Sequence, residues 1–302
     1  MREILCKTIL TDFPHHYTSN DPTYSLNPYR GCTHGCVYCY APSVLHEEER
    51  QWGSFVDVKV NAHLQLRREI RRKPKAIVFI SSAVDPYQPV EAKYQITRKC
   101  LEILQRHDWP VRILTRSPLI LRDIDLIASF SKKNVGISIT SVNTPKEIEP
   151  TVPSFQRRLG VLRRLATRGI PTWVSIAPII PDVTDRNLEF LIESIADVRV
   201  RTVTCGPLRL QMYPISFQNV RERSIIDYQR DANYYENVMC RIRDLCRIHG
   251  IDFNGEGNRD AQMVESGESI QRSVPRISLL DYLDSCDNEE SESRFGVVLV
   301  GQ

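Results

Sequence analysis

Residues 76–115 read AIVFISSAVDPYQPVEAKYQITRKCLEILQRHDWPVRILT. The two ends of this stretch, Ala76–Ser82 and Val111–Thr115, are short runs rich in β-branched residues, which favour strands. Between them, Thr97–His107 has the apolar spacing of an amphipathic helix. A strand, a helix and a second strand in this order predict a βαβ unit, in which the two strands are parallel.

The same alternation continues on both sides of that stretch. Further strands are expected at Tyr24–Leu26, Val135–Thr140, Thr172–Ala177 and Thr202–Cys205. Further helices are expected at His63–Arg72, Asp123–Lys132, Pro153–Arg168 and Thr184–Ala196. Strands without strict polar alternation, each followed by a helix, predict an α/β fold with a parallel sheet covered by helices. About six such units form only part of a TIM-type barrel, a partial (β/α)6 barrel.

The chain is expected to divide into four segments. An N-terminal extension, residues 1–23, precedes the barrel core at 24–210. A C-terminal helical extension follows at 211–283 and contains a long helix at Asp227–His249. Residues 284–302 are acidic at their start, which predicts a flexible tail.

Composition narrows the classes of protein. The chain has 302 residues, 41% of them hydrophobic and 25% charged, which is typical of a globular protein. It has no apolar run near the roughly 20 residues of a membrane span, and no secretory signal at its start, so a cytoplasmic location without membrane partners is expected. A net charge of +3 permits a nucleic-acid partner without arguing for one. The nine cysteines are not expected to form a disulfide framework.

Three of these cysteines share one loop, NPYRGCTHGCVYCYAP at Asn27–Pro42. Their spacing is Cys32-x3-Cys36-x2-Cys39, close enough for the sulfurs to meet on one small object. Soft sulfur ligands select iron–sulfur clusters, zinc or Cu(I). A cubane has four irons, so three cysteines leave one iron without a protein ligand. Gly31 and Gly35 suit a loop that needs positive φ or close backbone approach.

The cysteine spacing also permits other interpretations of the loop. Zinc with His34 as the fourth ligand is one, although the spacing of His34 fits a zinc knuckle poorly. A zinc-stabilised nucleic-acid-binding module is another. A third is a non-catalytic iron–sulfur protein for electron transfer or redox sensing, in which Cys6 or Cys205 folds back to cap the last iron.

CTHGCVYC resembles the CxxxCxΦC signature of the radical S-adenosylmethionine (SAM) superfamily, with Tyr38 in the aromatic position. Together with DPYQP at Asp85–Pro89 and APIIP at Ala177–Pro181, it is similar to the spore-photoproduct-lyase-like branch. The resemblance implies that Cys32, Cys36 and Cys39 hold a 4Fe–4S cluster. It also implies reductive cleavage of SAM to a 5′-deoxyadenosyl radical, which abstracts hydrogen from a substrate, with nucleic acid the first candidate. An outside reductant of flavodoxin or ferredoxin type would supply the electron.

The resemblance also implies further cofactor contacts at the strand ends. Tyr38 is expected near the adenine, where backbone groups of Ala177 and Ile179 would also meet SAM. Arg116 would pair with the methionine carboxylate. The hydroxyl candidates are Ser81 and Ser82 for the methionine ammonium and Ser138 for the ribose or the carboxylate. For Ser81, Ser82, Arg116 and Ser138, an ordinary strand-end or core position is an equal alternative.

The site that would hold the substrate is harder to predict. In the spore-photoproduct-lyase-like branch a cysteine near the end of the second strand donates hydrogen to the product radical, but Ile80–Ala83 contains none, which argues against lesion repair. Cys205 is the substitute candidate, although it suits a buried structural thiol better. The stiff loop Asp85–Glu91 is expected to hold Asp85, Gln88 and Glu91 toward a substrate, unless it is a simple structural turn.

Two basic stretches could contact phosphate groups. They are RREIRRKPK at Arg67–Lys75 and QRRLGVLRR at Gln156–Arg164. Both lie on predicted amphipathic helices, whose arginine faces, including Arg157 and Arg158, are expected to be solvated and away from the strand ends.

Overall fold

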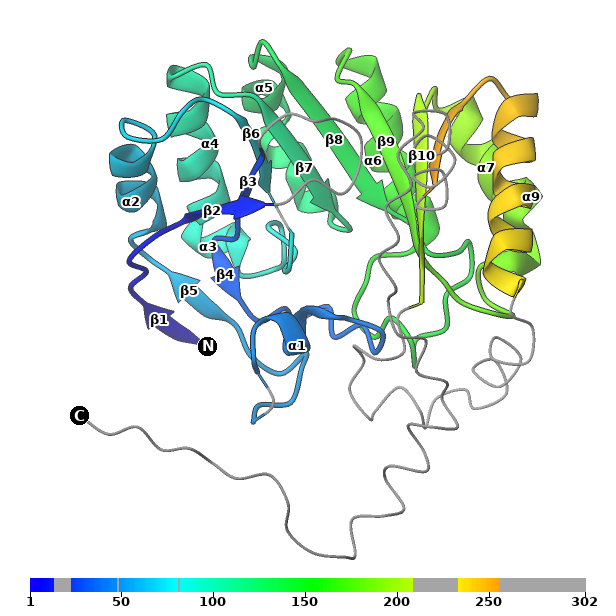
Figure 1. Cartoon of the computed structure of the whole chain (residues 1–302), viewed down its shortest axis with the longest axis horizontal. Coiled ribbons are helices and arrows are strands. Elements are labelled where there is room, and N and C mark those ends of the chain that lie inside the picture. Colours follow the sequence, from blue (N-terminus) through cyan, green and yellow to red (C-terminus); the bar gives the residue numbers. More distant parts are fainter. Residues whose placement is uncertain (14–22, 48, 81, 209–232, 256–302) are drawn as a thin grey trace, which may run out of the picture. The chain divides into compact units, whose positions relative to one another are not determined.

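The predicted βα alternation folds into one mostly parallel sheet, seen in the computed structural model of the chain (Figure 1). The strand order is β11-β10-β9-β8-β7-β6-β3-β2, and every neighbouring pair is parallel except β2 with β3. The strands are β2 (Leu10–Phe13), β3 (Thr23–Leu26), β6 (Ile77–Ile80), β7 (Val111–Thr115), β8 (Lys133–Ser138), β9 (Thr172–Ile179), β10 (Thr202–Pro207) and β11 (Asp252–Gly255). The predicted α/β class and all six predicted strands are confirmed.

The structure describes residues 1–13, 23–47, 49–80, 82–208 and 233–255. Ser81, the acidic segment at 284–302 and the start of the helix expected at Asp227 lie outside these residues. None of the helices among the described residues is both long enough and apolar enough to cross a membrane.

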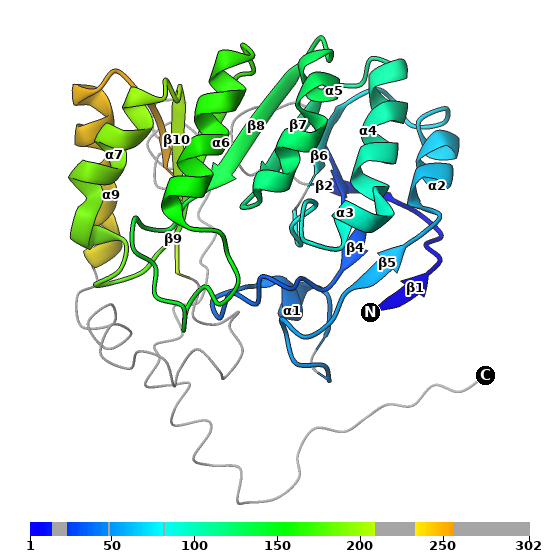
Figure 2. The same ribbon diagram turned by 180° about the vertical axis from the view of Figure 1, so that it is seen from behind.

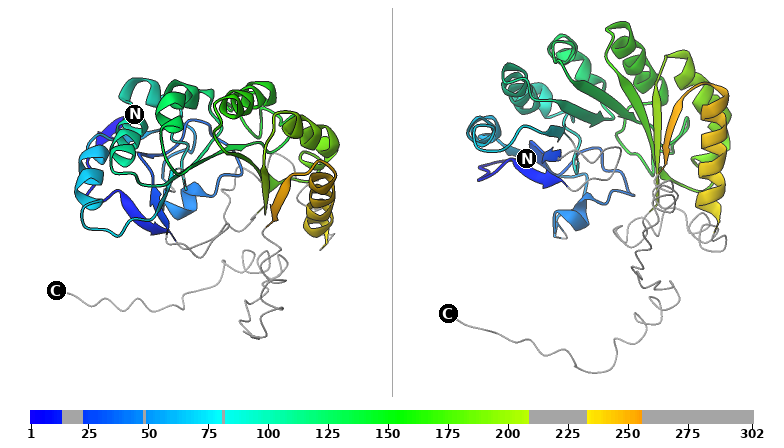
Figure 3. Two further views of the ribbon diagram at one scale, coloured as in Figure 1. Left: turned by 90° about the horizontal axis from the view of Figure 1, so that it is seen from above. Right: turned by 45° about the horizontal axis from the view of Figure 1, so that its top comes forward.

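Helices cover one face of the sheet and form an outer arc around it (Figures 2 and 3). The longer ones are α2 (Ala62–Glu69), α4 (Ile96–Arg106), α6 (Phe155–Thr167), α7 (Leu188–Asp197) and α9 (Tyr234–Ile248). The shorter ones are α1 (Ala41–Val44), α3 (Glu91–Tyr94), α5 (Ile124–Ala128) and the 3₁₀ segments η1 (Pro118–Asp123) and η2 (Asp185–Asn187). The five helices predicted for the core are therefore confirmed, with shifts of a few residues at their ends.

Apolar burial along successive strands forms the core. Each parallel strand from β3 to β10 contributes a side chain with 0% exposure: Leu26, Ile80, Ile113, Ile137, Val174 and Val203. In β8, β9 and β10 consecutive residues are buried, as in strands that are enclosed on both faces, whereas burial alternates along β7. That pattern made them recognisable in the sequence.

The described part of the C-terminal extension differs from a purely helical segment. After α9 the chain enters β11, which pairs in parallel with β10 and adds a seventh parallel strand. Its sequence, DFNG, is poor in strand-forming residues, so no sequence pattern predicted it.

The N-terminal segment also joins the fold through its strands. β2 pairs antiparallel with β3 at one edge of the large sheet. β1 (Arg2–Ile4), β5 (Asp57–Lys59) and β4 (Tyr29–Arg30) form a separate three-stranded sheet. β4 leads directly into the cysteine loop, so this small sheet fixes where the loop begins. Figure 1 shows α1, which follows the cysteines, beyond the arrowheads of β7 and β8, at the carboxyl ends of the strands.

Candidate functional site

The backbone of the cysteine loop depends on two glycines. Gly31 has φ of +83°, and a Cβ there would lie 2.5 Å from both the ring and the carbonyl oxygen of Phe55. Gly35 has φ of +61° and would bring a Cβ to 3.3 Å from the Cα of Gly53. Only glycine meets both demands without strain. The predicted need for positive φ and close approach at these positions is confirmed.

The loop after β6 holds the first half of the cysteine loop. Gln88 is fully buried, with 0% exposure. Its Nε2 donates a 3.1 Å hydrogen bond to the Gly31 carbonyl, and its Oε1 accepts one of 3.1 Å from the Thr33 amide. One side chain therefore satisfies two backbone groups that flank Cys32.

Asp85 connects the same region to the end of β7. Its Oδ1 accepts a 2.6 Å hydrogen bond from the Thr115 hydroxyl, and its Oδ2 accepts one of 2.7 Å from the Arg116 amide. The Nδ1 of His34 lies 3.5 Å from the Asp85 Oδ2. His34 is thus directed toward a carboxylate, which gives no support to its role as a zinc ligand.

Asp85, Gln88 and Glu91 were expected to face a substrate. The structure contradicts this expectation. All three are buried and bind the protein itself. Glu91 accepts hydrogen bonds from the Tyr29 hydroxyl, the Thr97 amide at 2.9 Å and Arg122 at 2.7 Å. A buried carboxylate needs such partners, and here they stiffen the loop instead of exposing it.

The second half of the cysteine loop packs against the ends of β8, β9 and β10. The Val37 amide donates a 3.1 Å hydrogen bond to the Ile148 carbonyl in the loop after β8. A small apolar cluster fills the space between them, consisting of Cys36, Tyr38, Ile148, Val152, Ile180, Val183 and Leu208. Residues far apart in the sequence therefore place the cysteines over the carboxyl ends of the strands.

The three thiols are free and largely enclosed. Cys32 and Cys36 are 7% and 5% exposed, and Cys39 is partly buried. Burial raises the pKa of Cys32 to about 12 and also raises the pKa values of Cys36 and Cys39. The nearby Arg116 guanidinium opposes this rise at Cys36 and Cys39. Thiolates at this position therefore need a positively charged partner, as a bound cluster would provide.

A single metal ion finds no ready site here. In the described ranges no three His, Cys, Asp or Glu side chains are gathered closely enough to hold one. The Cys32, Cys36 and Cys39 thiols nevertheless lie within electrostatic range of one another. The all-sulfur donor set fits an iron–sulfur cluster.

Both cysteines proposed as a fourth ligand have other surroundings in the structure. The Cys6 amide donates a 2.8 Å hydrogen bond to the Asn61 side chain at the start of α2. Cys205, predicted as a hydrogen donor, lies within β10 in the main apolar core and is 2% exposed. Its position favours a packing role over capping of a cluster.

A charged network lies beside the cysteines and was not predicted. The Arg116 Nη2 donates a 3.2 Å hydrogen bond to the Tyr38 hydroxyl, which in turn donates to Glu149. Thr140 donates to the same carboxylate at 3.0 Å, and the Arg158 Nη2 lies 3.4 Å from its other oxygen. Burial opposes ionisation of Glu149, but Arg158 and Arg116 outweigh it and hold its pKa below the usual value.

Arg158 is a correction to the solvated arginine face expected on α6. It is 2% exposed, and its Nη1 donates a 2.8 Å hydrogen bond to the Ser138 carbonyl at the end of β8. Nothing in the sequence separated it from its exposed neighbour Arg157, because both adjoin the apolar stripe of the helix.

The remaining predicted contacts lie at or near strand ends. The Ser82 hydroxyl, after β6, shares a hydrogen bond with Ser25 and accepts one of 2.8 Å from Asn27. Ser138 ends β8 and is buried. In β9, Ala177 is partly exposed and Ile179 is buried. The structure thus brings Tyr38 and Arg116 into contact. Ser82 follows β6, Ser138 ends β8, and both Ala177 and Ile179 lie in β9, so these residues come from three strands of the same sheet.

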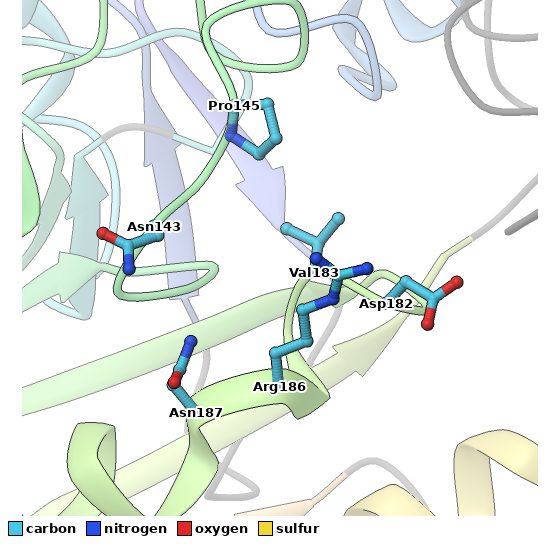
Figure 4. Close-up of a pocket in the computed structure, with 6 residues that line it drawn as sticks. All are labelled: Asn143, Pro145, Asp182, Val183, Arg186 and Asn187. Carbon is cyan, nitrogen blue, oxygen red and sulfur yellow. The ribbon is translucent and has the colours of Figure 1, made fainter.

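A cleft of about 160 Å³ opens between the loops after β8 and β9. Figure 4 shows the side chains that line it, which come from the loop after β8 and from the segment after β9 that includes η2. They are Asn143, Pro145, Asp182, Val183, Arg186 and Asn187. Val183 also belongs to the apolar cluster that contains Cys36, so the cleft adjoins the packing beneath the cysteine loop.

Comparison with known proteins assigns the family. Residues 26–195 match the sequence family described as the Radical SAM superfamily. The chain belongs to this superfamily. Radical SAM proteins are enzymes that use a 4Fe–4S cluster and SAM and that need a reductant, so membership implies these cofactors.

Two relatives show how far the sequence similarity extends, and one of them has radical SAM in its name. An uncharacterized protein of Methanocaldococcus jannaschii is 38% identical over 173 residues, which cover 56% of this chain and 64% of the relative. A radical SAM Nα-GlyT isomerase of Pseudomonas phage M6 is 28% identical over 180 residues, 57% of this chain and 36% of that protein. The matched part thus spans less than two thirds of these relatives.

The fold is similar to that of spore photoproduct lyase. A mutant of that enzyme with bound AdoMet and dinucleoside spore photoproduct superposes with a TM-score of 0.65, covering 83% of this chain and 80% of the lyase. Sequence identity is 15%, so this likeness concerns the fold. The predicted partial TIM-type barrel is confirmed.

Proposed function

We propose that this radical SAM enzyme holds its 4Fe–4S cluster through Cys32, Cys36 and Cys39 and leaves one iron for SAM. The observation that carries the proposal is the placement of three free cysteines in one braced loop over the carboxyl ends of a parallel sheet. In barrels of this kind the chemistry lies at those ends. The part of the chain described here offers no fourth cysteine at the loop, which favours catalysis over simple electron transfer.

When bound, the reduced cluster supplies the electron that cleaves SAM to methionine and a 5′-deoxyadenosyl radical. The chain's own residues bind, orient and enclose the cofactors. Arg116 would pair with the methionine carboxylate, because its Nε has no hydrogen-bond partner among the described residues. Tyr38, Ser82 and Ser138, and the backbone at Ala177 and Ile179, stay predicted contacts. Ser81 stays a prediction outside the described residues.

For the substrate, we propose nucleic acid or nucleotides as the first class to test. The dinucleoside bound to the lyase of the same fold supports this choice, whereas the missing cysteine after β6 argues against the same reaction. Cys205 stays the candidate hydrogen donor. The cleft beside Val183 offers amide, carboxylate and guanidinium groups for a polar substrate. A screen with deuterated candidates would identify the substrate by deuterium transfer to 5′-deoxyadenosine.

The proposal is tested by anaerobic reconstitution followed by addition of dithionite and SAM. The wild-type chain should bind about four irons and release 5′-deoxyadenosine. Cys36→Ala should lose the cluster absorbance and the product, because a cubane held by two cysteines has lost a third of its protein ligands. Iron content and liquid chromatography of the nucleoside measure both effects.

The matched control is Cys240→Ala, which changes a partly buried cysteine on α9. It should load iron and form 5′-deoxyadenosine as the wild type does. Full iron loading in Cys36→Ala, or zinc in place of iron in the wild type, would contradict the proposal.

A further inference from the structure

The Tyr38 hydroxyl lies between a cation and an anion. A phenol hydroxyl has a single hydrogen to donate. That hydrogen goes to Glu149, so the oxygen is left to accept from the Arg116 Nη2 at 3.2 Å. The hydrogen bonds therefore run in one direction, from Arg116 through Tyr38 to Glu149.

Glu149 is enclosed, and both of its carboxylate oxygens are already engaged by protein donors. It is 3% exposed, and its Oε1 accepts from Tyr38 and from the Thr140 hydroxyl at 3.0 Å. Its Oε2 lies 3.4 Å from the Arg158 Nη2. The Nη1 of the same guanidinium donates to the Ser138 carbonyl. A carboxylate committed to three protein donors acts through its neighbours.

Arg116, at the other end of the chain of hydrogen bonds, is not committed. Of its guanidinium nitrogens, only Nη2 donates a hydrogen bond within the described residues, and the buried Nε has no partner there. A guanidinium presents five N–H groups in a fixed fork, so the contact that fixes one nitrogen also sets the direction of the others.

We propose that Glu149 is a positioning residue for SAM. Through Tyr38 it fixes the Arg116 guanidinium so that its unused N–H groups meet the methionine carboxylate. This inference rests on the proposed function, because it takes SAM as the ligand of Arg116. It gives the loop after β8 a role in SAM binding, which is separate from the roles proposed for the cysteine motif and the strand-end serines.

Two substitutions interrupt the chain at different points. Glu149→Gln replaces one oxygen with an NH₂ group, which must face either the Arg158 donor or the Tyr38 hydroxyl. Tyr38→Phe removes the hydroxyl but leaves the ring packed in its apolar cluster. Each change frees Arg116 from its anchor. Loss of the partners that orient metal ligands typically costs about 10- to 100-fold in metal affinity or activity, and we expect a loss at the lower end of that range for SAM.

The experiment is isothermal titration of SAM into anaerobically reconstituted full-length protein, with iron content and the electron paramagnetic resonance signal of the reduced cluster recorded for each variant. Glu149→Gln and Tyr38→Phe should keep the iron and weaken SAM binding about tenfold each. The double variant should be no more than about twofold weaker than either single one, because both changes break the same chain. Glu147→Gln, an exposed glutamate two residues away, is the matched control and should bind SAM as the wild type does.

The results separate the inference from the proposed function. Unchanged SAM affinity in Glu149→Gln or in Tyr38→Phe overturns the inference, and so does a double variant whose loss is the product of the single losses. If Glu149→Gln fails to load iron, Tyr38→Phe and the milder Thr140→Val, expected to weaken SAM binding less, still decide the matter. A wild-type protein that loads a cluster but neither binds nor cleaves SAM contradicts the proposed function itself.

Discussion

The loop after β6, Asp85–Glu91, and the loop after β8, residues 139–154, both press buried polar groups against the cysteine loop, but in different ways. The first binds backbone, since Gln88 holds the Gly31 carbonyl and the Thr33 amide. The second binds a side chain, since Glu149 holds the Tyr38 hydroxyl beside Arg116. We infer that the first loop fixes the positions of the cysteine sulfurs. The second loop fixes the orientation of the Arg116 guanidinium, which faces SAM. Substitutions in the two loops should therefore separate cluster loading from SAM binding.

The largest effect on loading is expected from Gly31→Ala. The new Cβ would lie 2.5 Å from Phe55, at a backbone with φ of +83°, so the loop must change its path. Iron content after anaerobic reconstitution should fall severalfold or more.

Gly160→Ala is the matched control for that substitution. A Cβ there meets nothing within 4 Å in the middle of α6, and alanine favours helix over glycine by about 1 kcal/mol. This variant should load iron normally and unfold at the same or a higher urea concentration. Normal loading in Gly31→Ala would show that the cysteine loop does not need its present path.

Gln88→Leu should have the next largest effect. It keeps the side-chain volume but leaves two buried backbone groups without partners, at a cost of about 1–3 kcal/mol each. Urea denaturation of the apoprotein should show this loss, and iron content should fall. Molecules that still load a cluster should bind SAM with nearly wild-type affinity, in contrast to Glu149→Gln. Gln51→Leu, at an exposed position, is the control for the substitution type. A loss of SAM affinity in cluster-loaded Gln88→Leu would contradict the inference that the two loops have different roles.

The smallest expected effect is the acid dependence of stability. The fold holds the pKa of Glu149 below its usual value, through Arg158 and Arg116 acting against burial. Its stabilisation is therefore complete above the unfolded pKa of about 4.3 and is lost as the pH falls through the lower folded value. The melting temperature of apo Glu149→Gln should vary less with pH in this window than that of Glu147→Gln. The difference in slope is at most one proton, about 1.4 kcal/mol per pH unit, and identical slopes would count against an ionised Glu149.

The contrast between the loops also shows what sequence can and cannot predict. Local patterns sufficed for the six strands, for the spacing of Cys32, Cys36 and Cys39, and for the two glycines, because each depends on residues near one another in the chain. Gln88 binds residues 55 and 57 positions away, and Tyr38 binds Glu149 across 111 positions. Such contacts exist only after the strand ends have met.

Burial explains the other differences. Arg158 and Arg157 have the same surroundings in the sequence, yet only Arg158 is buried. Its guanidinium binds Glu149 and the Ser138 carbonyl in the interior. β11 forms from a poor strand sequence because the edge of β10 offers it a ladder of backbone partners. In both cases tertiary context outweighs local propensity.

The central claim is that three cysteines hold a cubane with one iron left for SAM. Mössbauer spectroscopy of protein reconstituted with ⁵⁷Fe tests it most directly, recorded with and without SAM. We predict that one of about four irons changes its isomer shift when SAM is added, while the rest keep theirs. A spectrum in which SAM alters no iron, or in which all irons already have protein ligands, would contradict the account.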